Sequence, residues 1–276
     1  AFYNQMLPVD AAQCSMDSLE EATRINPDHS RTHTGWALYH MFFSWNWSAA
    51  SHHLKLALAH QDSDQFFYHS TLLRAGGMYL VSTCHFDEAI AMYKKALKME
   101  PMNIAIQLEL ARAYAYKRDY LVALETVESM IRSRPDFLPA FEAKGWILFS
   151  MGRQREGIEA FEYARHNATL PITALAGLAY AYARTSQSAL AESTRLLLQS
   201  LYQDLPNHVS HLDLALAHLG ALEYESMFDQ LQKAAACKMP MLIFLEANPI
   251  WDEIKRFNAY RELKKTIFGE DQRPPL

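Results

Sequence analysis

The residues best able to do chemistry in this sequence are twelve histidines and three cysteines. His52 and His53 are adjacent, as are Cys84 and His85, and these pairs come nearest to a metal-ligand cluster. Adjacent helical residues point in different directions, so such a pair does not share an ion without ligands from elsewhere. The cysteines are far apart and form no Cys-x-x-Cys spacing, which argues against a thiolate metal site and a disulfide framework. We therefore predict no metal and no cofactor.

Catalytic motifs are also missing. The sequence contains no phosphate-binding glycine loop, no His-Glu-x-x-His and no Gly-x-Ser-x-Gly. No acid, base and nucleophile are predicted to converge, and the acidic residues on helix faces are most simply solvated. The protein is predicted not to be an enzyme, which we keep only as a distant alternative.

Charge and hydropathy exclude two further classes. The formal net charge is −5 and the pI about 6.2, so the chain lacks the basic excess that neutralises nucleic-acid phosphates. No run approaches the roughly 20 apolar residues of a membrane span. We expect neither direct nucleic-acid binding nor a membrane partner, and a reducing, cytoplasmic location. Because the sequence begins without methionine, we also expect it to be part of a longer chain.

A repeat organises the elements that position these residues. Glycine is rare, and Ala, Leu, Glu, Lys and Met recur at helical spacing almost throughout. One set of small and apolar residues marks two successive helices: Leu73, Gly77, Leu80, Ala89, Tyr93 and Ala96. A similar order recurs after 34 residues, at Leu110, Ala111, Tyr114, Ala123, Val127 and Met130, and again at Phe141, Gly145, Leu148, Gly157, Phe161 and Ala164. The period predicts paired helices, with proline at many of the ends.

The breaks in this pattern predict four segments. Residues 1–29 form a partial N-terminal helical unit, and residues 30–240 hold about five helix pairs. Residues 241–268 form a C-terminal cap, in which 244–254 is expected to be an extended stretch followed by a short helix. The cap is expected to end in an amphipathic helix from about Asn258 to Phe268, which covers an exposed end of the array. Residues 269–276 are expected to be a loose tail.

The 34-residue pattern resembles the tetratricopeptide repeat (TPR), in which two antiparallel helices form each unit. This resemblance covers nearly the whole chain. It implies an all-α, right-handed superhelical solenoid of antiparallel helix pairs with a C-terminal capping helix. It also implies a protein-interaction scaffold, because such arrays bind a peptide or protein segment on their concave surface.

In TPR arrays the first helix of each pair lines the concave face. Carried over to this sequence, that geometry nominates partner-binding residues after the small packing residue and one turn later: Trp36, Tyr39, His40, Arg74, Met78, Arg112, Tyr116, Glu142, Trp146, Phe149, Tyr180 and Arg184. Aromatic rings and guanidinium groups suit a peptide groove because they provide contact area and bidentate contacts to carboxylates. Packing between helices is the alternative role for the same residues. The identity of the partner, and self-association, are left open.

The end of the chain suggests a second function. Asn248-Pro249, Trp251-Asp252 and the aromatic segment from Phe42 to Ala50 resemble the C-terminal TPR regions of large bacterial signalling proteins, where the array follows a winged-helix regulator, a cyclase or a kinase. Arg256-Phe257 departs from that pattern, because such proteins often have Asp-Pro there. This resemblance implies a sensory or regulatory C-terminal domain as the alternative function.

Overall fold

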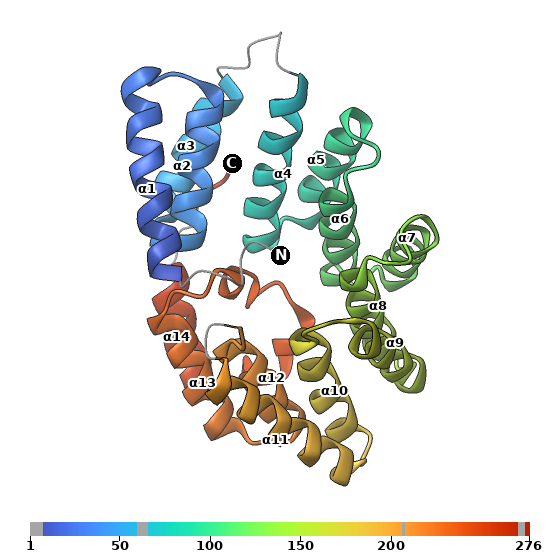
Figure 1. Cartoon of the computed structure of the whole chain (residues 1–276). Helices are drawn as coiled ribbons and strands as arrows, with labels where there is room; N and C mark the ends of the chain where they lie inside the picture. The colour runs from blue at the N-terminus through green and yellow to red at the C-terminus, as the bar shows by residue number, and fades with distance from the viewer. Residues whose placement is uncertain (1–7, 60–65, 206–207, 270–273) are drawn as a thin grey trace. The chain divides into compact units, whose positions relative to one another are not determined.

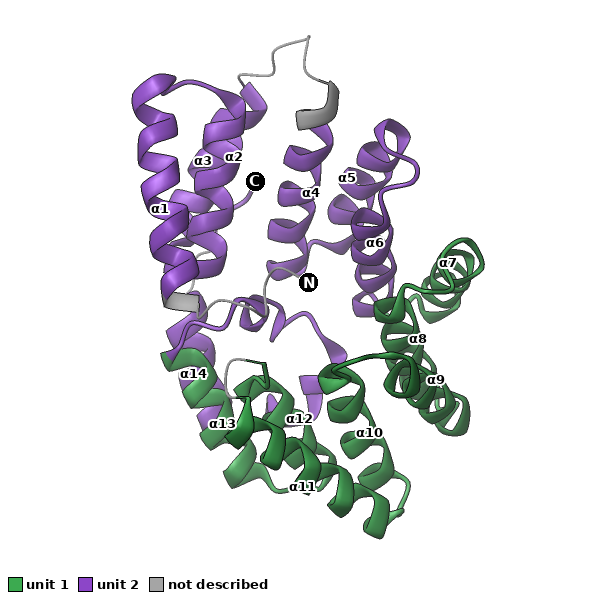
Figure 2. Cartoon of the chain, in the orientation of Figure 1, with its two compact units in different colours: residues 1–5, 118–236 green, residues 6–117, 237–276 purple. Residues whose placement is uncertain are grey.

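The computed structural model describes residues 8–59, 66–205, 208–269 and 274–276, and the regular elements in these ranges are all helices (Figure 1). The predicted all-α, TPR-like pairing is confirmed. The right-handed sense of the superhelix stays a prediction. The chain divides into two compact units, shown in Figure 2, and each is described by itself.

Unit 2 joins the beginning of the chain to its end, because it contains residues 6–117 and 237–276. Its elements, in chain order, are α1 (Pro8–Ile25), α2 (Ser30–Tyr39), the π-helical turn η2 (His40–Ser44), α3 (Trp47–Ala59), α4 (Phe66–Ser82), α5 (Phe86–Met99), α6 (Ile104–Tyr116), the 3-10 helices η3 (Pro240–Phe244) and η4 (Pro249–Ile254), and α14 (Asn258–Phe268).

The described part of unit 1 lies within the continuous segment 118–236, in which the helices pack as successive antiparallel hairpins. Its elements are α7 (Tyr120–Ser133), α8 (Leu138–Ser150), α9 (Gln154–Asn167), α10 (Ile172–Arg184), α11 (Ser188–Asp204), α12 (His211–Gly220) and α13 (Tyr224–Ala236).

The repeat is visible in the backbone as well as in the core. Between the two helices of successive pairs, one residue has a left-handed conformation, and four of these residues follow one another at 34-residue intervals: Cys84, Arg118, Gly152 and Ser186, with φ of 63°, 72°, 78° and 60°. Leu222 occupies the same place between α12 and α13, with φ of 62°. The residue after it closes the helix end, since the amide of Glu223 donates to His218 O at 3.0 Å. This is the Schellman pattern, which satisfies carbonyls that a helix end otherwise leaves unpaired.

Small residues let the paired helices approach, as the sequence predicts. A Cβ placed on Gly77 would lie 2.5 Å from the Tyr93 ring, and one on Gly145 would lie 2.6 Å from the Phe161 ring. Tyr93 and Phe161 are fully buried. Each ring therefore fills the space that the missing side chain leaves on the facing helix.

The C-terminal elements differ in part from the prediction. Of the stretch expected to be extended, Phe244 ends the 3-10 helix η3 and residues 245–247 form a turn, whereas the short helix expected after it is present as the 3-10 helix η4. Pro240 and Pro249 stand at the first helical positions of η3 and η4, where the missing amide costs nothing. The amphipathic helix α14 runs from Asn258 to Phe268, as predicted, and buries Tyr260, Leu263 and Ile267. This helix contacts α3, since the Trp47 indole donates to Ile267 O at 2.8 Å. No periodic pattern predicts a contact over that sequence distance.

Candidate peptide-binding surface

The twelve predicted site residues lie on α2, η2, α4 and α6 in unit 2 and on α8 and α10 in unit 1. All are buried or partly buried. Met78 and Tyr180 are the most enclosed, at 6% and 9% exposure. The two sets are described within their own units.

In unit 1 the structure brings four of these residues together, which we call the aromatic–arginine ladder: Trp146, Phe149, Tyr180 and Arg184. The Tyr180 ring centroid lies 5.4 Å from the ring of Trp146 and 5.4 Å from that of Phe149. The Arg184 guanidinium carbon lies 5.3 Å from the same centroid. Trp146 and Tyr180 are 34 residues apart, so repeat geometry places them at equivalent positions on α8 and α10. The ladder offers partly exposed rings and a cation, a combination suited to an apolar side chain and a carboxylate.

Packing holds this ladder in place. The Trp146 ring also contacts buried Phe161, with centroids 5.0 Å apart. A Cβ on Gly220 of α12 would lie 2.5 Å from Tyr180 Cα, so the backbones of α10 and α12 are very close. The fifth predicted residue of this unit, Glu142, accepts a hydrogen bond of 2.7 Å from Thr173 Oγ1. These contacts give the surface little freedom to rearrange before it binds a ligand.

In unit 2, three of the predicted residues on α4 and α6 lie near enough to buried Tyr93 to affect its pKa: Arg74, Arg112 and Tyr116. Burial raises the pKa of Tyr93 well above its ordinary value; nearby Glu109 raises it further, while Arg74 and Arg112 act in the opposite direction. Burial also raises the pKa of Tyr116, partly offset by Arg112. The Tyr116 ring lies 6.3 Å from that of Phe244 in η3. This part of the predicted surface is therefore contacted by the chain's own C-terminal elements.

The predicted residues nearest the N-terminus form a stack of rings with the histidines of α3. The His53 ring lies 6.1 Å from Trp36 and 5.6 Å from His40, nearly parallel to both, and its Nδ1 is 3.1 Å from Nδ1 of His33. Trp36 donates to Thr23 Oγ1 of α1 at 2.8 Å, and Tyr39 lies edge-on to Trp36. The rings of α2, η2 and α3 thus pack as one group, and the Trp36 hydrogen bond joins this group to α1.

Protonation of this stack is unfavourable. Burial, followed by the neighbouring histidines, lowers the pKa of His53 to about 4, and burial lowers the pKa of His40. Within the residues that the structure describes, no group of three or more His, Cys, Asp or Glu side chains is placed to hold a metal ion. His40 and His53 are therefore neutral packing groups at neutral pH.

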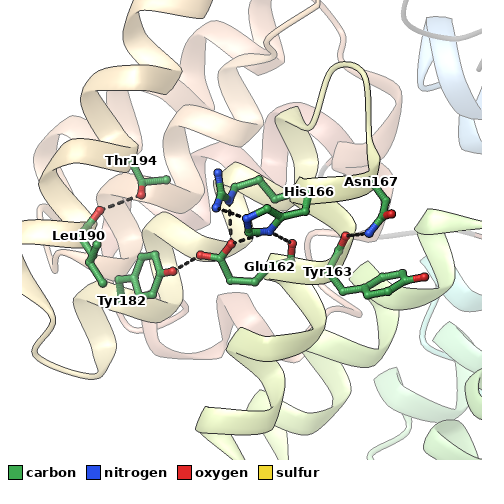
Figure 3. A network of polar contacts seen from close by, with 8 residues as sticks. Glu162, Tyr163, His166, Asn167, Tyr182, Leu190 and Thr194 are labelled. Carbon is green, nitrogen blue, oxygen red and sulfur yellow. Dashed lines mark hydrogen bonds and ion pairs between the residues drawn. The ribbon is translucent and has the colours of Figure 1, made fainter.

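One further polar network joins α9 to α10 (Figure 3). Tyr182 donates to the Glu162 carboxylate, which also accepts from Arg165 Nε at 2.7 Å and lies 3.3 Å from Nδ1 of His166. Burial and the bond to Glu162 raise the pKa of Tyr182 to about 12. For Glu162, burial raises the pKa, but the hydrogen bonds from Tyr182 and Arg165 outweigh it and lower the pKa overall. A tyrosine held protonated and a carboxylate held ionised clamp two helices and are not poised for proton transfer.

The sequence did not single out the residues that contact the end of the chain. Tyr79 donates to the backbone carbonyl of Pro274 and Ser51 to that of Pro275, and Gly76 lies beside Leu276. Ser51 and Tyr79 look like ordinary packing residues in the periodic pattern. Only the aromatic segment that includes Trp47 marked this region as unusual.

The fold of this chain is similar to that of the solved structure of PilF. No protein-family model matches the sequence. Among solved structures, PilF of Pseudomonas aeruginosa has a TM-score of 0.54 and 15% identity, over 79% of this chain and 90% of that one. Yeast Tom70 has a TM-score of 0.48 and 14% identity, over 94% of this chain and 62% of that one. YrrB, described as a TPR protein with an unusual peptide-binding site, has a TM-score of 0.44 and 18% identity, over 75% and 97%.

Two further observations bear on the class of protein. Among the described helices, none combines the length and the apolar character that a bilayer crossing needs. The paired helices, the 34-residue backbone period and the likeness to PilF agree on one architecture. The chain is therefore a TPR-like helical-repeat protein.

Proposed function

We propose that this chain is a protein-interaction scaffold, not an enzyme, and that it binds a peptide or protein segment on the surface formed by the first helices of its pairs. The observation that carries the proposal is the aromatic–arginine ladder, in which a guanidinium and three rings are held in one partly exposed group. Aromatic and arginine side chains dominate the binding energy of many protein interfaces.

The ladder also suggests the chemistry of the ligand. Trp146 and Phe149 offer apolar contact area with few rotatable bonds to order, so binding them costs little entropy. Arg184 lies over the Tyr180 ring, which fixes its guanidinium near the apolar surface. A segment with an apolar anchor next to an acidic residue satisfies both features.

A peptide-display selection against the whole chain tests this proposal. Selected peptides are titrated against Arg184→Ala, and we expect at least tenfold weaker binding because the cation next to the anchor is lost. Arg155→Ala is the matched control, since Arg155 is on α9 and its side chain is 93% exposed. Equal affinity of all selected peptides for the chain, Arg184→Ala and Arg155→Ala would refute the role of the ladder.

A further inference from the structure

The end of the described chain occupies a site between two helices of unit 2. Tyr79 of α4 donates its hydroxyl to the carbonyl of Pro274 at 2.5 Å, and Ser51 of α3 donates to the carbonyl of Pro275 at 3.1 Å. Figure 1 marks this end of the chain between α3 and α4. We call the site formed by Trp47, Ser51, Gly76 and Tyr79 the α3–α4 site.

The site recognises backbone carbonyls in a way that suits proline. The hydroxyls of Tyr79 and Ser51 donate to two successive carbonyls. Proline has no backbone N–H, so Pro274 and Pro275 enter the site without an amide donor that needs a partner. Proline also restricts the free segment to extended conformations, which reduces the entropy lost on binding.

Two aromatic rings and a glycine form the remaining walls of the site. The rings of Trp47 and Tyr79 lie 5.9 Å apart, and both side chains are almost fully buried. A Cβ on Gly76 would lie 2.6 Å from Met92 Sδ and 3.5 Å from Leu276 Cδ2, so Leu276 lies against α4 beside Gly76 and Met92. Aromatic-lined sites of this kind bind extended proline-containing segments in other folds.

The preceding helix keeps the segment close to its site. The Trp47 indole donates to Ile267 O, and its ring lies 5.5 Å from that of Phe268 at the end of α14. This attachment raises the effective concentration of Pro274–Leu276 at the α3–α4 site. A separate segment must compete with that concentration to enter.

We propose that the α3–α4 site binds extended, proline-containing segments that carry an apolar residue after the prolines, and that the chain's own Pro274–Leu276 occupies it in cis. The inference deepens the proposed function, on which it rests, by adding a second peptide site and a competitor built into the chain. A partner segment of this type binds only as it displaces Pro274–Leu276.

A labelled peptide with the sequence of residues 269–276 tests the proposal by fluorescence anisotropy. A variant lacking residues 270–276 is expected to bind this peptide at least tenfold more tightly than the full chain, in which the site is occupied. In the shortened variant, Tyr79→Phe removes one donor and is expected to weaken binding about fivefold. Tyr114→Phe, on α6, makes the same change away from the site and leaves binding unchanged.

A second variant covers the case in which the shortened chain does not fold. Pro274→Gly with Pro275→Gly keeps the full length and all four site residues, but loosens the cis segment. We expect this variant to bind the labelled peptide at least fivefold more tightly than the unaltered chain.

Two results would overturn the inference. One is that neither variant, shown by circular dichroism to be folded, binds the peptide more tightly than the full chain. The other is that Tyr79→Phe has no effect on binding. If peptides selected for the ladder lose affinity on Arg184→Ala under those conditions, the proposed function stands and the α3–α4 site alone fails.

Discussion

Leu222 stands at the left-handed turn between α12 and α13, where only glycine is free of steric cost. Its φ is 62°, and the hydrogen bonds around it run from backbone amides to the carbonyls of Leu219 and His218. The side chain is 50% exposed, so its removal leaves no cavity in the core. Leu222→Gly therefore changes the conformational energy of one residue and leaves the turn's hydrogen bonds in place.

The size of the effect follows from two opposed terms. A non-glycine residue in the left-handed region costs about 1–2 kcal/mol. Glycine loses more backbone entropy than other residues on folding, which costs about 0.5–1 kcal/mol. Leu222→Gly should therefore stabilise unit 1 by about 0.5–1 kcal/mol, which at a urea m-value of about 2 kcal/mol/M raises the midpoint by about 0.3–0.5 M.

Urea unfolding followed by circular dichroism at 222 nm measures this shift, and native-state hydrogen exchange on α12 and α13 localises it. Leu222→Ala is the matched control, because it removes the exposed side chain but keeps the Cβ that makes the turn costly. Gly152→Ala makes the opposite change at φ of 78° in open space, and should destabilise. A lower midpoint for Leu222→Gly, or the same gain from Leu222→Ala, would contradict the steric explanation.

Three further perturbations follow from the packing and the titrating groups. Gly145→Ala forces a Cβ to 2.6 Å from the Phe161 ring and should cost about 1–3 kcal/mol in chemical unfolding; an unchanged midpoint would mean that the ring moves freely. The pKa of His53 is about 4 in the folded chain and about 6.5 when unfolded, so the unfolded chain binds a proton more readily. The free energy of unfolding is therefore at its full value above pH 6.5 and decreases as the pH falls toward 4. Since the ring is partly solvated, we expect a loss of about 1–2 kcal/mol. His53→Phe should flatten the pH profile of the midpoint, and an unaltered slope would exclude His53 as its source. Tyr182→Phe removes the bond to Glu162 and should destabilise by about 1 kcal/mol above pH 5 in thermal unfolding, with a smaller effect where Glu162 is protonated.

The sequence predicted the helix pairs because their packing is local and periodic. Ala89, Tyr93 and Ala96 lie on one face of α5 by their spacing alone, and all three are fully buried. The same argument placed the bounds of α14. The left-handed turns were not predicted, although their period is the same, because Cys84, Arg118 and Leu222 are not turn-forming residues by type.

The candidate site was predictable only where repeat geometry applies. Trp146 and Tyr180 are equivalent positions on α8 and α10, so repeat geometry puts their rings side by side, as the structure shows. The contact between Trp47 and Ile267 could not be predicted, because nothing in either segment encodes a partner about two hundred residues away. The roles of the twelve nominated residues in binding, and the resemblance to signalling proteins, stay predictions.

The contacts that join α3 and α4 to the last described residues distinguish this protein from an ideal repeat array. In an ideal solenoid each repeat contacts only its neighbours, so stability is a sum of local terms and folding can begin anywhere. Here α3 and α4 are bridged by Pro274 and Pro275, so the interface between them depends on residues from the far end of the chain. Closing such a long loop is slow and entropically costly, which places completion of unit 2 after the local pairs have formed. The α3–α4 site is thus the part of the array held by a contact that can be exchanged for a segment of another molecule without unwinding any helix pair.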